Sequence, residues 1–286
     1  MTLTIDHLTP LEKTLLITLT GRALDARTKN PLLGDDLADK ILDRLGPDVG
    51  SVKLSSTVKI AVPIRTMMLD RVVAGFIAAH PNAVVVELGC GLETRMHRLS
   101  PPATVDWYDV DLPAVIALRR RMIPELQDAH LIAASLTDPN WLDGIPRDRP
   151  AIAVADGVVA FLTEADNKQI FTALTDHFTA GGELAFNIGT RLAARMMGFL
   201  GVLRAVGFPK GYRGYGIDDP HDIERLNPRL MFVEEQLGAQ AVDSLSDSRS
   251  RAWAAQIPWP TRMLAKWFAH WRAQARRGVW IVRYRY

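Results

Sequence analysis

Apolar residues recur at helical spacing through most of the first eighty residues. Apolar residues recur every three or four positions over 10–45, with a break that contains Pro31 and Gly34, and recur again over 62–79. This spacing places the apolar side chains on one face of each helix, and the break is a turn signal. The pattern predicts two helices before residue 45, a third over 62–79, and so a helical cap over residues 1–80.

Short apolar runs alternate with helical segments from residue 81 to residue 190. Strands are predicted at 83–88, 104–110, 130–134, 151–155 and 183–188, with helices at 113–121 and 164–178 among them. An almost wholly apolar strand suits a parallel sheet that is covered on both faces. The alternation predicts an open α/β sheet with right-handed crossovers and a ligand crevice at the carboxyl ends of its strands.

The pattern changes after residue 190. It predicts an amphipathic helix at 191–206, a glycine-rich loop at 208–221, a strand at 230–234, a polar loop at 243–251, a basic helix at 262–277 and an antiparallel strand at 278–286. We therefore expect one domain over 1–286. It comprises the cap, a cofactor-binding core at 81–190, a substrate lid at 191–228 inserted after strand five, and C-terminal strands and helix at 229–286. The sheet is doubly wound, mostly parallel and seven-stranded.

Composition and charge narrow the function classes. The 286 residues are 48% hydrophobic and 23% charged, which is ordinary for a globular protein. Because 34 Lys and Arg face 32 Asp and Glu, no general attraction to nucleic acid is expected. One cysteine, no leader-like start and no long uncharged apolar run predict a cytoplasmic protein without stable membrane association.

The turn after the first predicted strand carries Gly89-Cys90-Gly91. Glycine permits a tight turn and lets a nucleotide-like ligand approach the main chain, next to a helix N-terminus. The third glycine of a dinucleotide fingerprint is missing, because Glu93 and Thr94 stand there, and a carboxylate would repel a pyrophosphate. The turn therefore predicts a nucleotide-like ligand other than NAD.

Polar residues follow the other predicted strands at their carboxyl ends. Asp111 stands twenty residues after Gly91, where a carboxylate can accept both ribose hydroxyls. Ser135 and Leu136 follow the third strand, and Asp156 follows the fourth. Because parallel strand ends meet along one edge, these residues predict a crevice for an adenosine-sized ligand.

These residues resemble a known family, the leucine carboxyl methyltransferase and tetracenomycin polyketide O-methyltransferase-like group of class I S-adenosylmethionine-dependent methyltransferases. The resemblance rests on Ala23-Leu24-Asp25-Ala26-Arg27 with Pro31-Leu32-Leu33, Arg65 before Asp70, Glu87 to Arg95, Trp107 to Pro113, and Asp156-Gly157. It implies a Rossmann-like fold with S-adenosyl-L-methionine as cofactor.

The resemblance also implies roles for single residues. The turn from Glu87 through Gly89 and Gly91 faces the methionine part of the cofactor, while Arg65 holds its carboxylate. Asp111 takes the ribose, and Lys13 also reaches the cofactor.

Two residues depart from the family pattern. Ser135 stands where the family usually has an acidic residue on the adenine amino group; it can hydrogen-bond but has no charge. Asp156 stands where the family often has Glu, so a contact to the methionyl amine is rearranged or water-mediated.

Candidates for the acceptor side lie further along the chain. Tyr212, Arg213 and Tyr215 in the lid could clamp an aromatic or carboxylate substrate, or could pack on their neighbours. His97 and His221 are candidate general bases for a phenol, with a solvated or structural histidine as the alternative. The histidines show no metal-ligand spacing, so no metal is expected.

The basic helix predicted at 262–277 groups apolar residues on one face: Met263, Leu264, Trp267, Phe268 and Trp271. This is the profile of an interfacial membrane helix. The same profile describes a helix that packs on a sheet or on the partner of a homodimer, which we favour.

The function we expect is an O-methyltransferase acting on a small-molecule acceptor. A carboxylate or phenolic oxygen attacks the methyl group in line, and a carboxylate needs no base, whereas a phenol would benefit from one. Two alternatives remain open, a cofactor-binding module without catalysis and a nicotinamide-dependent dehydrogenase.

Overall fold

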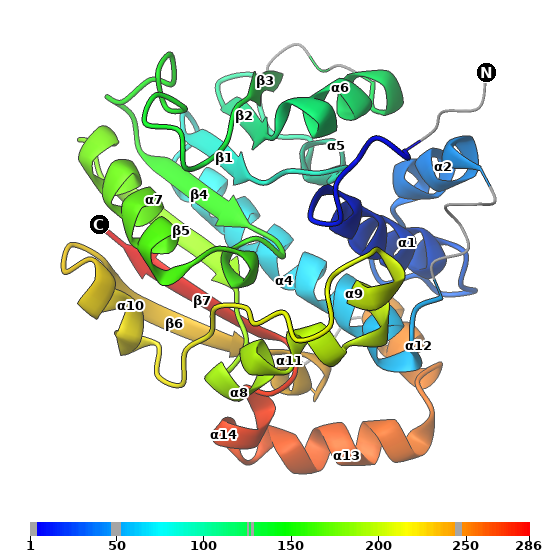
Figure 1. Cartoon of the computed structure of the whole chain (residues 1–286). Helices are drawn as coiled ribbons and strands as arrows, with labels where there is room; N and C mark the ends of the chain where they lie inside the picture. The colour runs from blue at the N-terminus through cyan, green and yellow to red at the C-terminus, as the bar shows by residue number, and fades with distance from the viewer. Residues whose placement is uncertain (1–4, 47–52, 125, 127–128, 244–247) are drawn as a thin grey trace.

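Seven strands form one sheet in the order β3-β2-β1-β4-β5-β7-β6 (Figure 1). Their bounds are β1 Val84–Leu88, β2 Asp106–Asp111, β3 Ala129–Ala133, β4 Ala151–Ala155, β5 Gly182–Asn187, β6 Met231–Leu237 and β7 Trp280–Arg285. β7 runs antiparallel to both of its neighbours, β5 and β6, whereas the pairs among β1 to β5 are parallel. The computed structural model, which describes residues 5–46, 53–124, 126, 129–243 and 248–286, thus confirms the predicted sheet.

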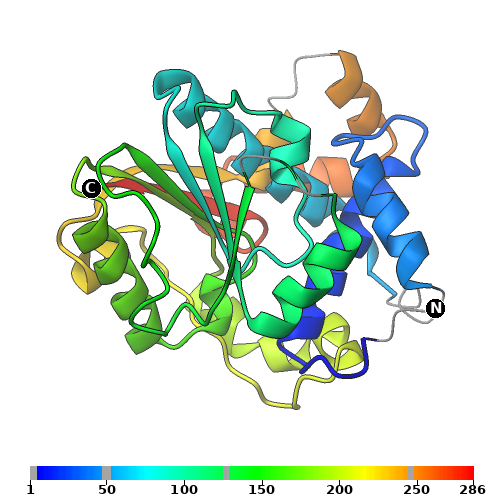
Figure 2. The same cartoon turned by 90° about the horizontal axis from the view of Figure 1, so that it is seen from above.

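Alternate residues of the central strands enter two separate cores. Val84, Val86 and Leu88 pack with α7 (Glu164–His177) on one face, whereas Val85 packs with α4 (Ser56–Ala79) on the other. Figure 2 shows the sheet between these two helices. Side chains alternate along a strand, so a strand buried on both faces must be apolar throughout apart from functional positions. Glu87 is the exception in β1.

Shorter helical segments surround the sheet. They are η1 Glu12–Thr14, α1 Leu15–Ala26, α2 Asp36–Leu45, α5 Arg95–Leu99, α6 Pro113–Met122, η2 Val159–Phe161, α8 Arg191–Arg195, η3 Met197–Phe199, α9 Gly201–Ala205, α10 His221–Leu226, α11 Gly238–Asp243, α12 Ser248–Ala255, α13 Trp259–Ala269 and α14 Arg272–Ala275. Side chains cap several of them. Thr163 and Asp166 form a capping box at the start of α7, and the Asp35 side chain accepts the Ala38 N–H at the start of α2.

The two N-terminal helices pack on α6 beyond the carboxyl ends of the strands. Leu19 in α1, Ile41 in α2 and Leu118 in α6 belong to one buried cluster. The turn that joins α1 to α2 is fixed by Asp25, whose carboxylate accepts the N–H of Leu32 at 3.0 Å and of Leu33 at 2.8 Å. The predicted cap is therefore present.

The lid differs from the single helix predicted at 191–206. The segment consists of three short pieces, α8, η3 and α9. The cause is a close crossing at Gly198, whose N–H donates to the Tyr212 carbonyl at 2.9 Å and where an added Cβ would lie 2.4 Å from the Tyr212 nitrogen. Helical periodicity does not reveal such a crossing, which depends on a segment further along the chain.

Three other predicted boundaries shift. α4 begins at Ser56, before the predicted residue 62, and contains Pro63, although proline favours a first turn. The basic helix at 262–277 is divided into α13 and α14, because Trp271 is extended, with φ −119° and ψ 92°. The polar loop at 243–251 gives way to α12 at Ser248, while residues 244–247 of that prediction lie outside the described residues.

Candidate active site

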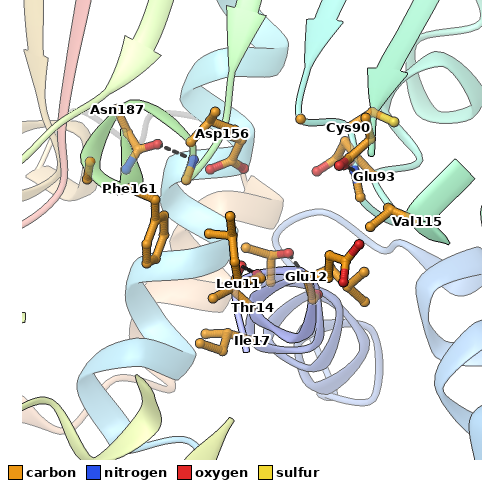
Figure 3. A pocket seen from close by; sticks show the side chains of 18 of the residues that line it. Leu11, Glu12, Thr14, Ile17, Cys90, Glu93, Val115, Asp156, Phe161 and Asn187 are labelled. Carbon is orange, nitrogen blue, oxygen red and sulfur yellow. Dashed lines mark hydrogen bonds between the residues drawn. The ribbon is translucent and has the colours of Figure 1, made fainter. Parts of the chain in front are cut away.

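A cavity of about 390 Å³ lies at the carboxyl ends of the parallel strands. Figure 3 shows Asp156 and Asn187 at strand ends on one side of it, Cys90 and Glu93 on a second, and Thr14 and Ile17 of the N-terminal segment below. Helix α4 and the lid supply further walls, including Val62, Arg65, Met197, Leu200 and Leu203. This volume is in the range of small-molecule sites.

The glycine turn after β1 exposes its main chain to the cavity. Gly89 has φ +60° and Gly91 has φ +49°, the left-handed region that disfavours other residues. A Cβ on Gly89 would lie 2.6 Å from Cγ2 of Val158. Both glycines line the cavity, so the turn supplies a close approach that a side chain would block.

Asp111 at the end of β2 is held by two main-chain donors. Its Oδ2 accepts the Gly91 N–H and its Oδ1 the Leu112 N–H, each at 2.7 Å. Burial raises the pKa of Asp111 to about 6, although both hydrogen bonds act to lower it. Each carboxylate oxygen keeps a second acceptor position, so the residue can accept two hydroxyl groups.

Arg65 and Asp156 form a buried ion pair at the cavity wall. The Arg65 Nε lies 2.5 Å from Asp156 Oδ1, and the side chains are 17% and 7% exposed. Neither Asp156 oxygen has a hydrogen-bond partner among the described residues. Buried carboxylate oxygens usually have partners, so this pair is suited to a ligand with its own ammonium and carboxylate groups.

Glu87 connects the cavity to a buried arginine. It pairs with Arg95, whose Nε lies 2.7 Å from Asp70 Oδ1. Burial raises the pKa of Glu87 to about 8, because desolvation outweighs the attraction of Arg95.

Glu93 is neutralised by two arginines. Its Oε1 lies 2.6 Å from Arg22 and 2.7 Å from Arg98, which hold the pKa of Glu93 well below its usual range despite burial. Arg98 also pairs with Asp35 and Asp70. The sequence argument treated Glu93 as a free negative charge at the turn, whereas the structure makes it the centre of an ion-pair network that ties α1 and α5 together.

The remaining predicted crevice residues also reach the cavity. Ser135 and Leu136 line it after β3, and the Ser135 and Thr137 hydroxyls share a hydrogen bond of 2.8 Å. Cys90 is 4% exposed, and burial raises the pKa of its thiol well above the ordinary value, which makes it a packed residue rather than a nucleophile.

The predicted acid–base candidates lie elsewhere. His97 is outside the cavity lining, its Nε2 is 3.1 Å from the Pro124 carbonyl, and burial lowers its pKa. His221 is exposed at the start of α10 and pairs with Glu224, which raises its pKa. Lys13 is also absent from the lining, although its neighbours Glu12 and Thr14 belong to it.

The predicted lid residues stand behind the cavity wall. The Tyr212 hydroxyl donates to the carbonyl of Phe161, a lining residue, at 3.1 Å. The Tyr215 N–H donates to the Ala160 carbonyl at 2.9 Å, and Arg213 is exposed. The two tyrosines thus support the wall by packing on their neighbours.

Among the lining residues that sequence reasoning missed are Glu12, Phe161 and Asn187. Asn187 ends β5 and accepts the Gly157 N–H at 2.6 Å, so the strand-end rule that found Asp111 would have found it too. Glu12 accepts the Thr9 N–H and hydroxyl at 2.7 Å, a local pattern that predicts a turn but not its place in the molecule.

The fold and the site together define a class. Six parallel strands and one antiparallel strand, with a glycine turn after β1 and a carboxylate after β2, form an α/β enzyme domain for an adenosine-containing cofactor. The family model for leucine carboxyl methyltransferase matches residues 16–175, and the chain belongs to this family.

Relatives agree with this membership. The tetracenomycin polyketide synthesis O-methyltransferase TcmP of Streptomyces glaucescens is 39% identical over 229 residues, 80% of this chain and 83% of the relative. The S-adenosyl-L-methionine-dependent methyltransferase dpfgK of Gibberella zeae is 29% identical over 251 residues, 79% of this chain and 82% of the relative. The predicted class, a methyltransferase that depends on S-adenosylmethionine, is therefore confirmed.

A solved structure supports the fold. A candidate methyltransferase from Thermobifida fusca aligns with a TM-score of 0.53 and 17% identity, over 93% of each chain. Within the described ranges, no helix has the length and apolarity that crossing a membrane requires. Nor do the described residues bring together three or more His, Cys, Asp or Glu side chains that could hold a metal ion.

Proposed function

We propose that this chain is an O-methyltransferase that methylates a carboxylate on a largely apolar small molecule. One observation supports this choice over a phenol. The wall formed by the N-terminal segment, α4 and the lid is mostly apolar, although Glu12, Thr14, Thr18 and Arg65 belong to it. No histidine, lysine or tyrosine is among the described residues that line the cavity. A carboxylate acceptor is already ionised and needs no base.

The residues present fit the cofactor. The unsatisfied oxygens of Asp156 would bind the methionyl ammonium, and Arg65 beside it the methionyl carboxylate. Asp111 would accept the ribose hydroxyls. Gly89 and Gly91 leave room for the part of the cofactor that joins the ribose to the methionyl group. Ser135 and Leu136 would lie against the adenine. When bound, S-adenosylmethionine supplies an electrophilic methyl group to the acceptor oxygen.

The protein aligns the two reactants and excludes water from the cavity. The contacts of Glu87 with Arg95, of Glu93 with Arg22 and of Arg65 with Asp156 hold the cofactor side in place, and the apolar residues of the wall exclude water from the acceptor side. Alignment of two bound reactants is by itself a large rate effect, so no acid–base residue is required.

We also infer that residues 1–286 act as a single domain. The cavity takes lining residues from the cap at 1–80, the core at 81–190 and the lid at 191–228, so no one of these segments encloses it alone.

Calorimetric titration with S-adenosylmethionine and S-adenosylhomocysteine tests the cofactor site. We expect Asp156→Asn and Asp111→Ala to weaken binding about tenfold or more, because each loses a charge-assisted contact. Asp176→Asn, a change at an exposed side chain, should bind like the wild type. No binding to the folded wild type would overturn the assignment.

Methyl-transfer assays with paired aromatic carboxylic acids and phenols test the acceptor. We expect methyl esters from the acids. Turnover of phenols only, lost in Glu12→Gln, would instead show that a base is used and would refute the carboxylate proposal.

A further inference from the structure

Helix α13 presents an exposed apolar stripe. Trp259, Met263, Trp267 and Trp271 are 66%, 61%, 59% and 61% exposed. The first three stand four residues apart in α13, which places them on one face, and the rings of Trp267 and Trp271 lie 6.3 Å apart. Figure 1 shows α13 along the outside of the molecule, below α11. The favoured expectation is that this face packs on a sheet or on the partner of a homodimer; the sheet does not cover these four side chains, and the homodimer stays a prediction.

The segment that carries this stripe has charge of one sign. From Trp259 to Arg277 there are five Lys and Arg residues and no Asp or Glu. Arg272 and Arg276 pair with Glu235 of β6, and Lys266, Arg272 and Arg277 are exposed. Lys266 stands next to Trp267 and one helical turn after Met263, so its ammonium flanks the stripe.

We propose that α13 and Trp271 form a docking surface for an anionic lipid bilayer. Tryptophan favours the membrane–water interface, and Lys or Arg beside it binds acidic headgroups while the apolar side chains enter the acyl boundary. A contact made through one helix face at the headgroup boundary is peripheral and reversible. Such a contact agrees with the expectation of no stable membrane association.

Charge favours a bilayer over a second copy of the chain. In a twofold dimer built on this stripe, the basic segment 259–277 of one copy would face the same segment of the other, which supplies no Asp or Glu to offset the charge. An anionic bilayer, in contrast, complements the positive charge of 259–277.

Flotation of the full chain with vesicles tests the proposal. We expect binding to vesicles of phosphatidylcholine with phosphatidylglycerol, weak binding to phosphatidylcholine alone, and release by salt. Lys266→Glu should reduce the partition about fivefold or more. Trp267→Ser should reduce it as well, whereas Met231→Ser, at another exposed apolar side chain on β6, should leave it unchanged.

The unmodified protein offers an independent readout. Four tryptophans are buried, Trp107, Trp141, Trp253 and Trp280, and three are exposed on the surface proposed to dock. Brominated lipid should therefore quench only part of the fluorescence, and only in anionic vesicles. Equal binding to neutral vesicles, no binding at all, or a dimer on gel filtration that Trp267→Ser dissociates would each overturn the proposal.

Discussion

Asp111 and Asp156 are both carboxylates at strand ends, yet their surroundings prepare them for different partners. Asp111 accepts two main-chain N–H groups and has a pKa of about 6. Asp156 faces one arginine and has no hydrogen-bond donor among the described residues. The first is therefore suited to neutral hydroxyl groups and the second to a cation.

Cofactor affinity should depend on pH through Asp111. Its raised pKa means that the carboxyl stabilises the ligand-free fold below its unfolded value of 3.8, and that this contribution is lost as pH rises through about 6. The ionised form accepts hydroxyls, so the dissociation constant should fall about tenfold from pH 5 to pH 7. Calorimetric titration from pH 5 to pH 7 measures this dissociation constant.

A control separates Asp111 from other groups. Asp111→Asn should bind more weakly at pH 7 and show a flat profile between pH 5 and 7, since Glu87 titrates higher, at about 8. A profile for Asp111→Asn as steep as that of the wild type would assign the dependence to another residue.

Glu93 should be a stability residue. Glu93→Gln removes the shared partner of Arg22 and Arg98, and breaking a buried ion pair costs about 3–5 kcal/mol. Asp176→Asn breaks a pair whose side chains are 62% and 57% exposed, and should cost no more than about 1 kcal/mol. Urea unfolding of both variants gives the comparison; similar midpoints would contradict it.

The same residue predicts acid sensitivity. Because the folded-state pKa of Glu93 is lowered, its stabilisation is present above the unfolded value of 4.5 and is lost as pH falls through the folded value. The unfolding midpoint of Glu93→Gln should therefore approach that of the wild type in acid.

The glycine turn is an element with no tolerance for a side chain. Gly89→Ala should destabilise the protein by about 1–2 kcal/mol through its positive φ alone, and should weaken cofactor binding further as Val158 moves. Gly75→Ala is the matched control, because Gly75 lies inside α4 with nothing within 4 Å of an added Cβ. It should stabilise by about 0.4–1 kcal/mol. Thermal unfolding and cofactor titration of both variants test this.

Elements that are set by a local sequence pattern were predictable. The central strands and α7 follow from apolar runs and helical periodicity, because β1 and β4 are buried on both faces and α7 packs one face on the sheet. The three short pieces of the lid were not predictable, since the crossing at Gly198 depends on Tyr212, and no local pattern links Tyr212 to Gly198. The exposure of Trp267 was likewise hidden, because an apolar helix face has the same sequence whether protein or solvent covers it.

At the scale of the whole molecule, the strand-end residues were predictable but the enclosure of the site was not. Gly91, Asp111 and Asp156 converge because parallel strands end at one edge. Glu12 and Phe161 reach the cavity only through the packing of the cap and of the segment after β4. Lys13, one residue from Glu12, shows how a shift of one helical position separates a lining residue from its neighbour.

The position of β7 has a consequence for biosynthesis. This strand lies between β5 and β6, and β6 pairs with no other strand of the described sheet. On the ribosome, β5 and β6 emerge first and wait with unpaired edges until 280–285 have been made. Such edges are where chains pair with one another, so the interval before β7 arrives is when the nascent protein is most exposed to aggregation.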